Sequence, residues 1–214
     1  VNNAVENHWD TVPSIRDWTY GDAMPSYTAG EATYGGVATV KFYLASDTEH
    51  LNPLDPVDAG EYVMVSTVPA GETEINGVTA AYQGLEQETE FTIHPYRVSV
   101  PDIMSVEYTG EQINVPYEDS KETFYGKEVT VYTVTGDAGK EIGDYSAKLS
   151  LSSTNFVWSD GTSEDKTVTW RIVSGGVPTY ADFAIDDGDE VYTGHQIKKN
   201  VICLRDGWNE GEHY

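Results

Sequence analysis

The chain has 214 residues, of which 12 are Lys or Arg and 36 are Asp or Glu, so its formal net charge is −24. This charge excludes nucleic acid as an expected partner, because phosphate binding requires a cationic surface. A single cysteine, Cys203, excludes an intrachain disulfide. No apolar stretch approaches membrane-spanning length, so we expect no membrane insertion. No signal peptide opens the chain, and we expect a mature or excised piece of a longer protein.

Strand-like alternation recurs along the chain, and no segment shows a sustained helical period. In residues 37–44, one face carries Ala38, Val40, Phe42 and Leu44, and the outer face carries Thr39, Lys41 and Tyr43. Residues 61–68 and 90–93 read similarly, and residues 128–134 form a weaker case. Residues 144–151 turn Tyr145, Ala147, Leu149 and Leu151 inward, and residues 167–173 do the same with Val168, Trp170 and Ile172. One-sided strands of this kind pack as two facing sheets.

An internal repeat organises these strands. Similar openers occur at Trp18-Thr19-Tyr20-Gly21, at Val106-Glu107-Tyr108-Thr109-Gly110 and at Val191-Tyr192-Thr193-Gly194. The first two are each followed by a Gly-x-Tyr element, Gly60-Glu61-Tyr62 and Gly143-Asp144-Tyr145. Such repeats predict serial modules. We therefore expect an all-β chain of tandem immunoglobulin-like β-sandwiches, with repeat 1 at residues 1–95, repeat 2 at 96–174 and a partial third β repeat at 175–214.

Turn and linker residues separate the predicted strands. The first boundary falls at His94-Pro95-Tyr96 and the second at residues 174–178, and both links are short. Short links predict limited bending between neighbours and an elongated arrangement. Asp160-Gly161, between residues 156–158 and the strand at 167, is read as a hairpin signal.

The Gly-x-Tyr elements resemble the tyrosine corner of immunoglobulin-type sandwiches, in which a Tyr hydroxyl bonds upstream backbone. Glycine would allow a tight turn before the strand. Two residues later, Met64 and Ala147 stand where antibody domains carry a core cysteine. The residues expected to matter are therefore structural: Tyr20, Tyr62, Tyr108 and Tyr145, with Gly60, Gly110 and Gly143.

Taken together, these motifs resemble the bacterial immunoglobulin-like repeats (MBG- and YDG-like) of large Gram-positive cell-surface proteins and adhesins. The resemblance covers roughly residues 7–173 and includes Asn7-His8-Trp9, Phe91-Thr92-Ile93 and Asn155-Phe156-Val157-Trp158. It implies an extracellular, cell-wall or cell-surface location and a stalk or adhesive role. It supplies no catalytic residues and no ligand.

Acidic side chains provide two candidate metal sites. Asp186, Asp187, Asp189 and Glu190 form the densest run, and their oxygens suit calcium. Their spacing does not match an EF-hand, so a solvated loop is the favoured interpretation and no cofactor is assigned. Asp55, Asp58 and Glu61 form a weaker candidate. An internal Lys–Asn or Lys–Asp crosslink is not expected, because Lys41 and Lys148 alternate outward.

Catalytic chemistry has little support in the residue pattern. The five histidines stand in no nucleophile context, and Cys203 lies in an apolar stretch typical of a small core residue. We expect no catalytic residues and no enzyme activity. Trp170 alternates inward, and Trp9, Trp18 and Trp158 are interpreted as packing residues, although an exposed aromatic platform could instead stack on sugar rings.

Two functional hypotheses follow. The first is a non-enzymatic stalk, spacer or adhesive segment of a bacterial cell-wall protein, a monomer within a longer multi-domain chain, whose partner is a host or cell-surface protein or a glycan. The alternative is a carbohydrate-binding accessory module of an exported glycan-active enzyme. A contiguous exposed aromatic strip would favour the alternative, and scattered single aromatics would favour the spacer.

Overall fold

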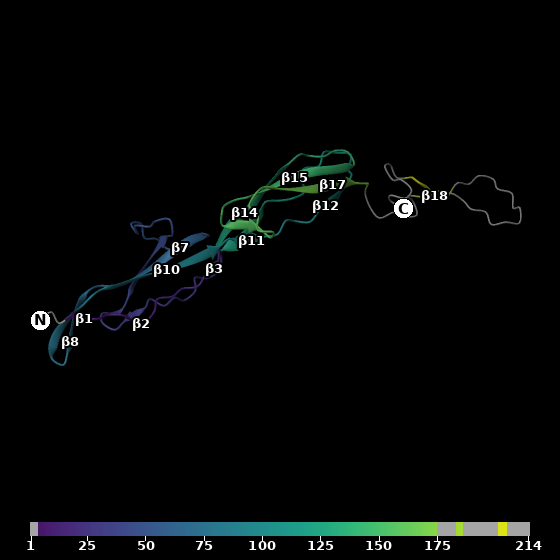
Figure 1. Cartoon of the computed structure of the whole chain (residues 1–214). Helices are drawn as coiled ribbons and strands as arrows, with labels where there is room; N and C mark the ends of the chain where they lie inside the picture. Colours follow the sequence, from purple (N-terminus) through teal and green to yellow (C-terminus); the bar gives the residue numbers. More distant parts are fainter. Residues whose placement is uncertain (1–3, 175–182, 186–200, 205–214) are drawn as a thin grey trace, which may run out of the picture. The chain divides into compact units, whose positions relative to one another are not determined.

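The structure is a computed structural model that describes residues 4–174, 183–185 and 201–204. Within these ranges the chain forms strands, turns and loops without any helix (Figure 1). The same ranges accordingly contain no helix long and apolar enough to cross a membrane. The all-β class predicted from the alternation is confirmed.

The chain folds into two compact units, each assembled from separated segments. Unit 1 comprises Val1–Ser99, Glu122–Val129 and Ser152–Ser163. Unit 2 comprises Val100–Lys121, Thr130–Leu151 and Glu164–Tyr214. Unit 1 therefore includes two pieces of the predicted second repeat. The repeat limits of 1–95, 96–174 and 175–214 stay a prediction.

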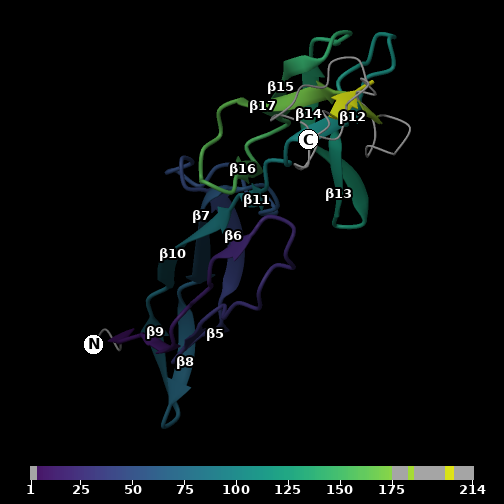
Figure 2. The ribbon, with the colours of Figure 1, turned by 90° about the vertical axis from the view of Figure 1, so that its right-hand side faces the viewer.

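The described residues of unit 1 form four small sheets. The central sheet has the order β3-β10-β7-β6, from β3 (Trp18–Thr19), β10 (Leu85–His94), β7 (Gly60–Val68) and β6 (Thr39–Leu44). The sheet β2-β4-β5 contains β2 (Trp9–Thr11), β4 (Glu31–Ala32) and β5 (Gly36–Val37). The sheet β1-β9-β8 contains β1 (Ala4–Val5), β9 (Val78–Tyr82) and β8 (Gly71–Ile75). A parallel pair joins β11 (Tyr96–Val98) to β16 (Phe156–Trp158) (Figure 2).

Unit 2 is organised around one five-stranded sheet. Its order is β12-β17-β15-β14-β13, from β12 (Met104–Glu107), β17 (Lys166–Val173), β15 (Gly143–Leu151), β14 (Lys127–Gly136) and β13 (Ser120–Phe124). The turn that joins β13 to β14 belongs to unit 1. A separate antiparallel pair joins β18 (Phe183–Ile185) to β19 (Val201–Cys203), with Phe183 opposite Cys203.

The four strands of the main unit 1 sheet have the same order as the first four strands of the main unit 2 sheet, and this is the structural counterpart of the sequence repeat. In each, a short opening strand runs parallel to the closing strand, as β3 does to β10 and β12 to β17. The closing strand is antiparallel to the Gly-x-Tyr strand, as β10 is to β7 and β17 to β15. The Gly-x-Tyr strand is in turn antiparallel to the next strand, β6 or β14. Both belong to the immunoglobulin-like β-sandwich class.

The two tyrosine corners predicted from sequence are present. The Tyr62 hydroxyl donates to the carbonyl oxygen of Asp58 at 2.8 Å, and the Tyr145 hydroxyl donates to that of Glu141 at 2.7 Å. Each ring stacks on the aromatic residue opposite it in the register, Phe91 for Tyr62 and Trp170 for Tyr145. Because the same bond spans four residues in both repeats, the Gly-x-Tyr element has the same role twice.

Core packing replaces a disulfide in both sandwiches. Met64 is fully buried and Ala147 is 1% exposed, as expected for residues at the antibody cysteine position. Trp18 stacks on Phe91 with ring centroids 5.2 Å apart, and Trp170 is fully buried beneath Tyr145. Apolar burial of this kind is the main stabilising term available to a chain without disulfides.

Replacing Tyr145 by alanine should sharply lower the melting temperature of unit 2. The substitution removes the corner hydrogen bond and a ring stacked 4.7 Å from Trp170, and we expect a loss of about 2 kcal/mol for this half-buried ring. Tyr145→Phe, which keeps the ring, should cost only about 1 kcal/mol. Calorimetry of both variants measures the difference, and a loss below about 0.5 kcal/mol for Tyr145→Ala would contradict the corner assignment.

Two strands differ from the predicted one-sided pattern. Leu44, placed on the inner face, is 42% exposed, whereas Tyr43, placed on the outer face, is 5% exposed. On β7 both faces are buried, because Val63 and Val65 form a second apolar cluster with Tyr43. His50, from the segment that follows β6, lies against the Tyr43 ring with centroids 4.9 Å apart. The alternation of residues along a strand cannot reveal that a residue from a loop, here His50, packs on its outer face.

The hairpin predicted at Asp160-Gly161 is wrong, although the turn exists. The Gly161 N–H donates to the Trp158 carbonyl, and the Asp160 carboxylate accepts from Thr162. The strand before the turn, β16, pairs with β11 instead of β17. The turn therefore redirects the chain from one sheet to another.

Gly60 does not have the predicted conformational role. A Cβ at this position would meet the Tyr62 ring at an ordinary contact distance of 3.5 Å, and the backbone is not left-handed. The corner at Tyr62 is therefore closed by the hydroxyl bond and ring packing, with no requirement for glycine.

Candidate functional site

The residues considered for metal binding or catalysis do not form a site in the described part of the chain. Asp186, Asp187, Asp189 and Glu190 lie outside the described residues. Among the residues that are described, no group of three His, Cys, Asp or Glu side chains is arranged to hold a metal ion, and this includes Asp55, Asp58 and Glu61. The Asp58 carboxylate instead accepts a hydrogen bond from the Asn155 amide at 2.9 Å.

One polar cluster was not anticipated from the sequence. The Thr33 hydroxyl donates to Asp10 at 2.7 Å and lies 3.1 Å from Nε2 of His8. The Asp10 carboxylate approaches that same ring nitrogen at 3.4 Å. In a nucleophile–His–Asp relay the carboxylate must bond the opposite ring nitrogen, so this exposed arrangement does not match hydrolytic chemistry.

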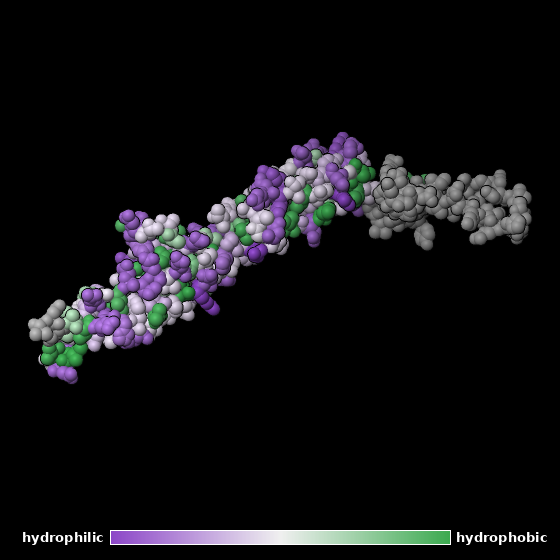
Figure 3. All heavy atoms as spheres, viewed as in Figure 1, coloured by the Kyte–Doolittle hydropathy of each residue, from purple (hydrophilic) through white to green (hydrophobic). Residues whose placement is uncertain are grey.

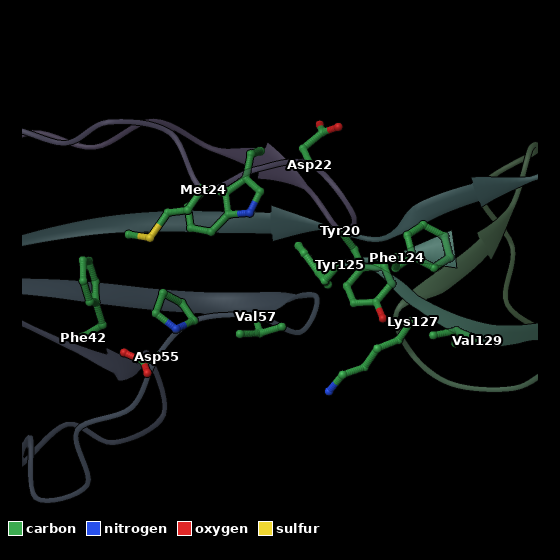
Figure 4. Close-up of a pocket in the computed structure, with 12 residues that line it drawn as sticks. Tyr20, Asp22, Met24, Phe42, Asp55, Val57, Phe124, Tyr125, Lys127 and Val129 are labelled. Atoms are coloured by element: carbon green, nitrogen blue, oxygen red, sulfur yellow. The ribbon is translucent and has the colours of Figure 1, made fainter. Parts of the chain in front are cut away.

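An apolar pocket of about 550 Å³ lies in unit 1 and is here called the Tyr20 pocket. Its aromatic walls include Trp18, Tyr20, Phe42, Phe124 and Tyr125, as Figure 4 shows for the last four. The remaining lining consists of apolar residues with three charged groups: Met24, Pro56, Val57, Val129, Asp22, Asp55 and Lys127. The pocket is thus an aromatic hollow with carboxylates and an ammonium group at its edge.

The pocket retains exposed apolar surface. Met24 is 38% exposed, Val57 is 46% exposed and Tyr125 is 47% exposed, and all three line it. Exposed apolar side chains are ordinary when scattered but indicate a contact surface when they gather. The Tyr20 pocket is therefore the best candidate for a ligand site in unit 1.

Tyr20 lies at the centre of an aromatic cluster next to the pocket. Its ring centroid is 5.0 Å from that of Phe124, 5.8 Å from that of Tyr125 and 5.6 Å from that of Phe156. Tyr96 also packs on Phe124, at 5.1 Å. These residues are far apart in sequence, and the cluster accounts for the inclusion of residues 122–129 and 152–163 in unit 1.

The turn that carries Tyr125 is strained. Tyr125 and Gly126 have φ angles of 51° and 75°, which define a two-residue hairpin turn of the primed type. Such a turn favours Asn or Asp at the first position, and a bulky residue with positive φ is an outlier. The strain is offset by contacts, because the Tyr125 hydroxyl accepts a hydrogen bond from the Gly21 N–H at 3.0 Å. This hydrogen bond and the edge contact between the Tyr125 and Tyr20 rings hold the turn against Tyr20.

Gly21 is required where the turn docks. Its φ is +96°, and a Cβ there would lie 2.5 Å from the Phe124 ring. Asn155 provides a second polar link, because its side-chain oxygen accepts from the Ala59 N–H at 2.7 Å and its amide donates to Asp58. The turn at Tyr125 and the loop that carries Asn155 are therefore both hydrogen-bonded to the residues around Tyr20.

Unit 1 should lose stability above pH 10. Burial, and next the Asp58 charge, raise the pKa of Tyr20 above its ordinary value of 10.0, and the same causes raise the pKa of Tyr62. The folded state therefore holds these protons more tightly than the unfolded chain, so stability is complete below pH 10 and falls as the pH rises through the raised values. Denaturant unfolding between pH 8 and about 12 should show the loss, with a smaller slope in Tyr62→Phe. Equal slopes would contradict the assignment.

No protein family matches the chain, and no curated protein matches it. Among solved structures, the tandem Ig domains of titin are similar, with 12% identity over 79% of this chain and 97% of the titin chain, at a TM-score of 0.26.

Proposed function

We propose that the chain is a non-enzymatic segment of a bacterial cell-surface protein and acts as a stalk or spacer. The observation that carries the proposal is the duplicated sandwich, in which one strand order and one tyrosine corner occur twice. Serial modules of one design suit a chain that spans distance or presents repeated weak contacts. The resemblance of the motifs to the MBG- and YDG-like repeats of Gram-positive surface proteins supports the same role.

The distribution of aromatic residues favours a spacer. Trp18, Trp158 and Trp170 are buried in the sandwiches, at 8% exposure or less. Among residues that the structure describes, the strongly exposed aromatic side chains are Tyr27, Tyr108 and Tyr125, which belong to different elements. On the face that Figure 3 shows, hydrophilic residues are spread along the described part of the chain, as expected for a net charge of −24. We place this segment outside the cell, at the cell wall or surface, as a monomeric part of a longer chain.

Single-molecule force spectroscopy tests the load-bearing role. The chain, inserted between marker domains and pulled through its ends, should give resolved unfolding peaks, because the hydrogen-bonded strands of its main sheets must separate before the chain extends. Tyr145→Ala should lower the unfolding force, because it removes the corner hydrogen bond of β15. Extension without any resolved peak would contradict the proposal. The flanking coding sequence offers an independent check, since an export signal and a wall-sorting signal would support a surface protein and a catalytic domain would not.

The Tyr20 pocket supports a second candidate, a carbohydrate-binding module. Exposed Tyr125 offers a ring face for stacking, and Asp22, Asp55 and Lys127 could bond sugar hydroxyls. Titration with soluble plant and cell-wall oligosaccharides, followed by NMR, should then shift signals of the pocket residues. Tyr125→Asn, which suits the turn but removes the ring, should abolish the shifts. An absence of shifts at millimolar sugar would eliminate this candidate.

A further inference from the structure

Tyr20, which aromatic side chains cover in unit 1, has an equivalent residue in unit 2. The Tyr20 N–H donates to the His94 carbonyl at 2.8 Å, and the Tyr108 N–H donates to the Val173 carbonyl at 2.8 Å. In unit 1, Ile93 on the closing strand pairs with Trp18 on one side and Gly60 on the other. In unit 2, Ile172 pairs likewise with Val106 and Gly143. Tyr108 is therefore equivalent to Tyr20, and Ile142, just before Gly143, is equivalent to Ala59.

These equivalent positions differ in exposure. Tyr20 is 7% exposed beneath Phe124, Tyr125 and Phe156. Tyr108 is 41% exposed and Ile142 is 42% exposed. Both lie at the end of the unit 2 sheet where β17 finishes, because β12 runs parallel and β15 antiparallel to β17. The surface that is covered in unit 1 is thus exposed in unit 2. It is also more apolar there, because Ile142 takes the place of Ala59.

The sequence beyond this sheet supplies a matching cover. Tyr192-Thr193-Gly194-His195-Gln196-Ile197 repeats Tyr108-Thr109-Gly110-Glu111-Gln112-Ile113. When Tyr108 is aligned with Tyr192 without gaps, Phe124 aligns with Trp208 and Tyr96 aligns with Tyr180. Phe124, which packs on Tyr20, and Tyr96, which packs on Phe124, therefore both have aromatic counterparts in the third repeat.

We propose that Tyr108 and Ile142 form a docking surface for the third repeat of this chain, with the Trp208 segment in the role that the Phe124 turn has on Tyr20. The driving force is burial of exposed apolar area together with an aromatic pair of the kind seen at Tyr20. The acidic residue beside Ile142, Glu141, corresponds to Asp58, which bonds the covering loop in unit 1. The inference rests on the repeat and not on the location of the protein, so its failure would leave the spacer proposal standing.

Hydroxyl-radical footprinting of the full chain, read by mass spectrometry, tests the proposal at the side chains concerned. Tyr27, which is 43% exposed, serves as the internal standard for an open tyrosine, and Tyr20 as the standard for a covered one. We expect Tyr108 to be oxidised at least fivefold more slowly than Tyr27. In Trp208→Ala, Tyr108 and Ile142 should both be oxidised faster, with Tyr108 reaching the rate of Tyr27.

A matched control comes from the same terminal segment. Tyr214→Ala also removes an aromatic ring there and should leave the oxidation of Tyr108 unchanged. Oxidation of Tyr108 at the rate of Tyr27 in the unaltered chain would overturn the proposal, as would protection that Trp208→Ala does not reduce. Protection that increases with protein concentration would identify a second copy as the occupant and would equally overturn it.

Discussion

Phe156→Ala should destabilise unit 1 by about 3–5 kcal/mol, the usual cost of deleting a buried aromatic ring. Phe156 is 1% exposed, and its ring contacts Tyr20 at 5.6 Å and Phe124 at 5.7 Å. It also belongs to β16, which pairs with β11 in unit 1. Although the sequence repeat assigns residue 156 to the second module, the damage should appear in the first.

Hydrogen exchange read by mass spectrometry can locate that damage. Peptides from β7 report on unit 1, and peptides from β15 report on unit 2. Phe156→Ala should accelerate exchange in β7 far more than in β15. Val157→Ala, the half-buried neighbour on the same strand, should cost less than about 1.5 kcal/mol. Loss of protection confined to β15 would show that residue 156 belongs energetically to unit 2.

Trp170→Ala should have a comparable effect in unit 2, again about 3–5 kcal/mol. The Trp170 side chain is fully buried and stacks on Tyr145 with centroids 4.7 Å apart. Its indole N–H has no hydrogen-bond partner among the described residues. Trp170→Phe should therefore cost clearly less than the alanine variant, because it keeps a ring and removes an unsatisfied donor.

The neighbouring residue provides the control for Trp170. Arg171 lies on the same strand, is exposed and bonds the Asp144 carboxylate at 2.9 Å. Arg171→Ala should cost less than about 1 kcal/mol, as is usual for surface ion pairs. Chemical denaturation of the three variants measures these differences. A loss for Trp170→Ala no greater than that for Arg171→Ala would contradict its place in the core.

The sequence pattern predicted those features that depend on residues close together in the chain, namely the inward faces of two strands and the corner hydrogen bonds. Alternation along residues 144–151 and 167–173 correctly placed Ala147, Leu149 and Trp170 inside, because these strands have one face toward the core. The Gly-x-Tyr spacing correctly predicted both corner hydrogen bonds, since each joins residues only four positions apart.

Long-range pairing escaped prediction. Nothing in the residues around Asn155 and Phe156 indicates that they bond Ala59 and pack on Tyr20. The Tyr20 pocket was missed for the same reason, since residues from widely separated segments line it. One signal was available in the sequence: Tyr125-Gly126 between two strands is a hairpin dipeptide with an unexpectedly large first residue. A residue that tolerates such a conformation poorly is a reason to search for a partner.

The interleaved composition of unit 1 has a consequence for how the protein is made. Ala59 and its hydrogen-bond partner Asn155 are separated by 96 positions. At ribosomal speeds of about 5–20 residues per second, the first leaves the exit tunnel roughly 5–20 s before the second. For that interval the nascent chain lacks part of the aromatic cover over Tyr20, so the amino-terminal sandwich cannot mature before much of its neighbour has been translated.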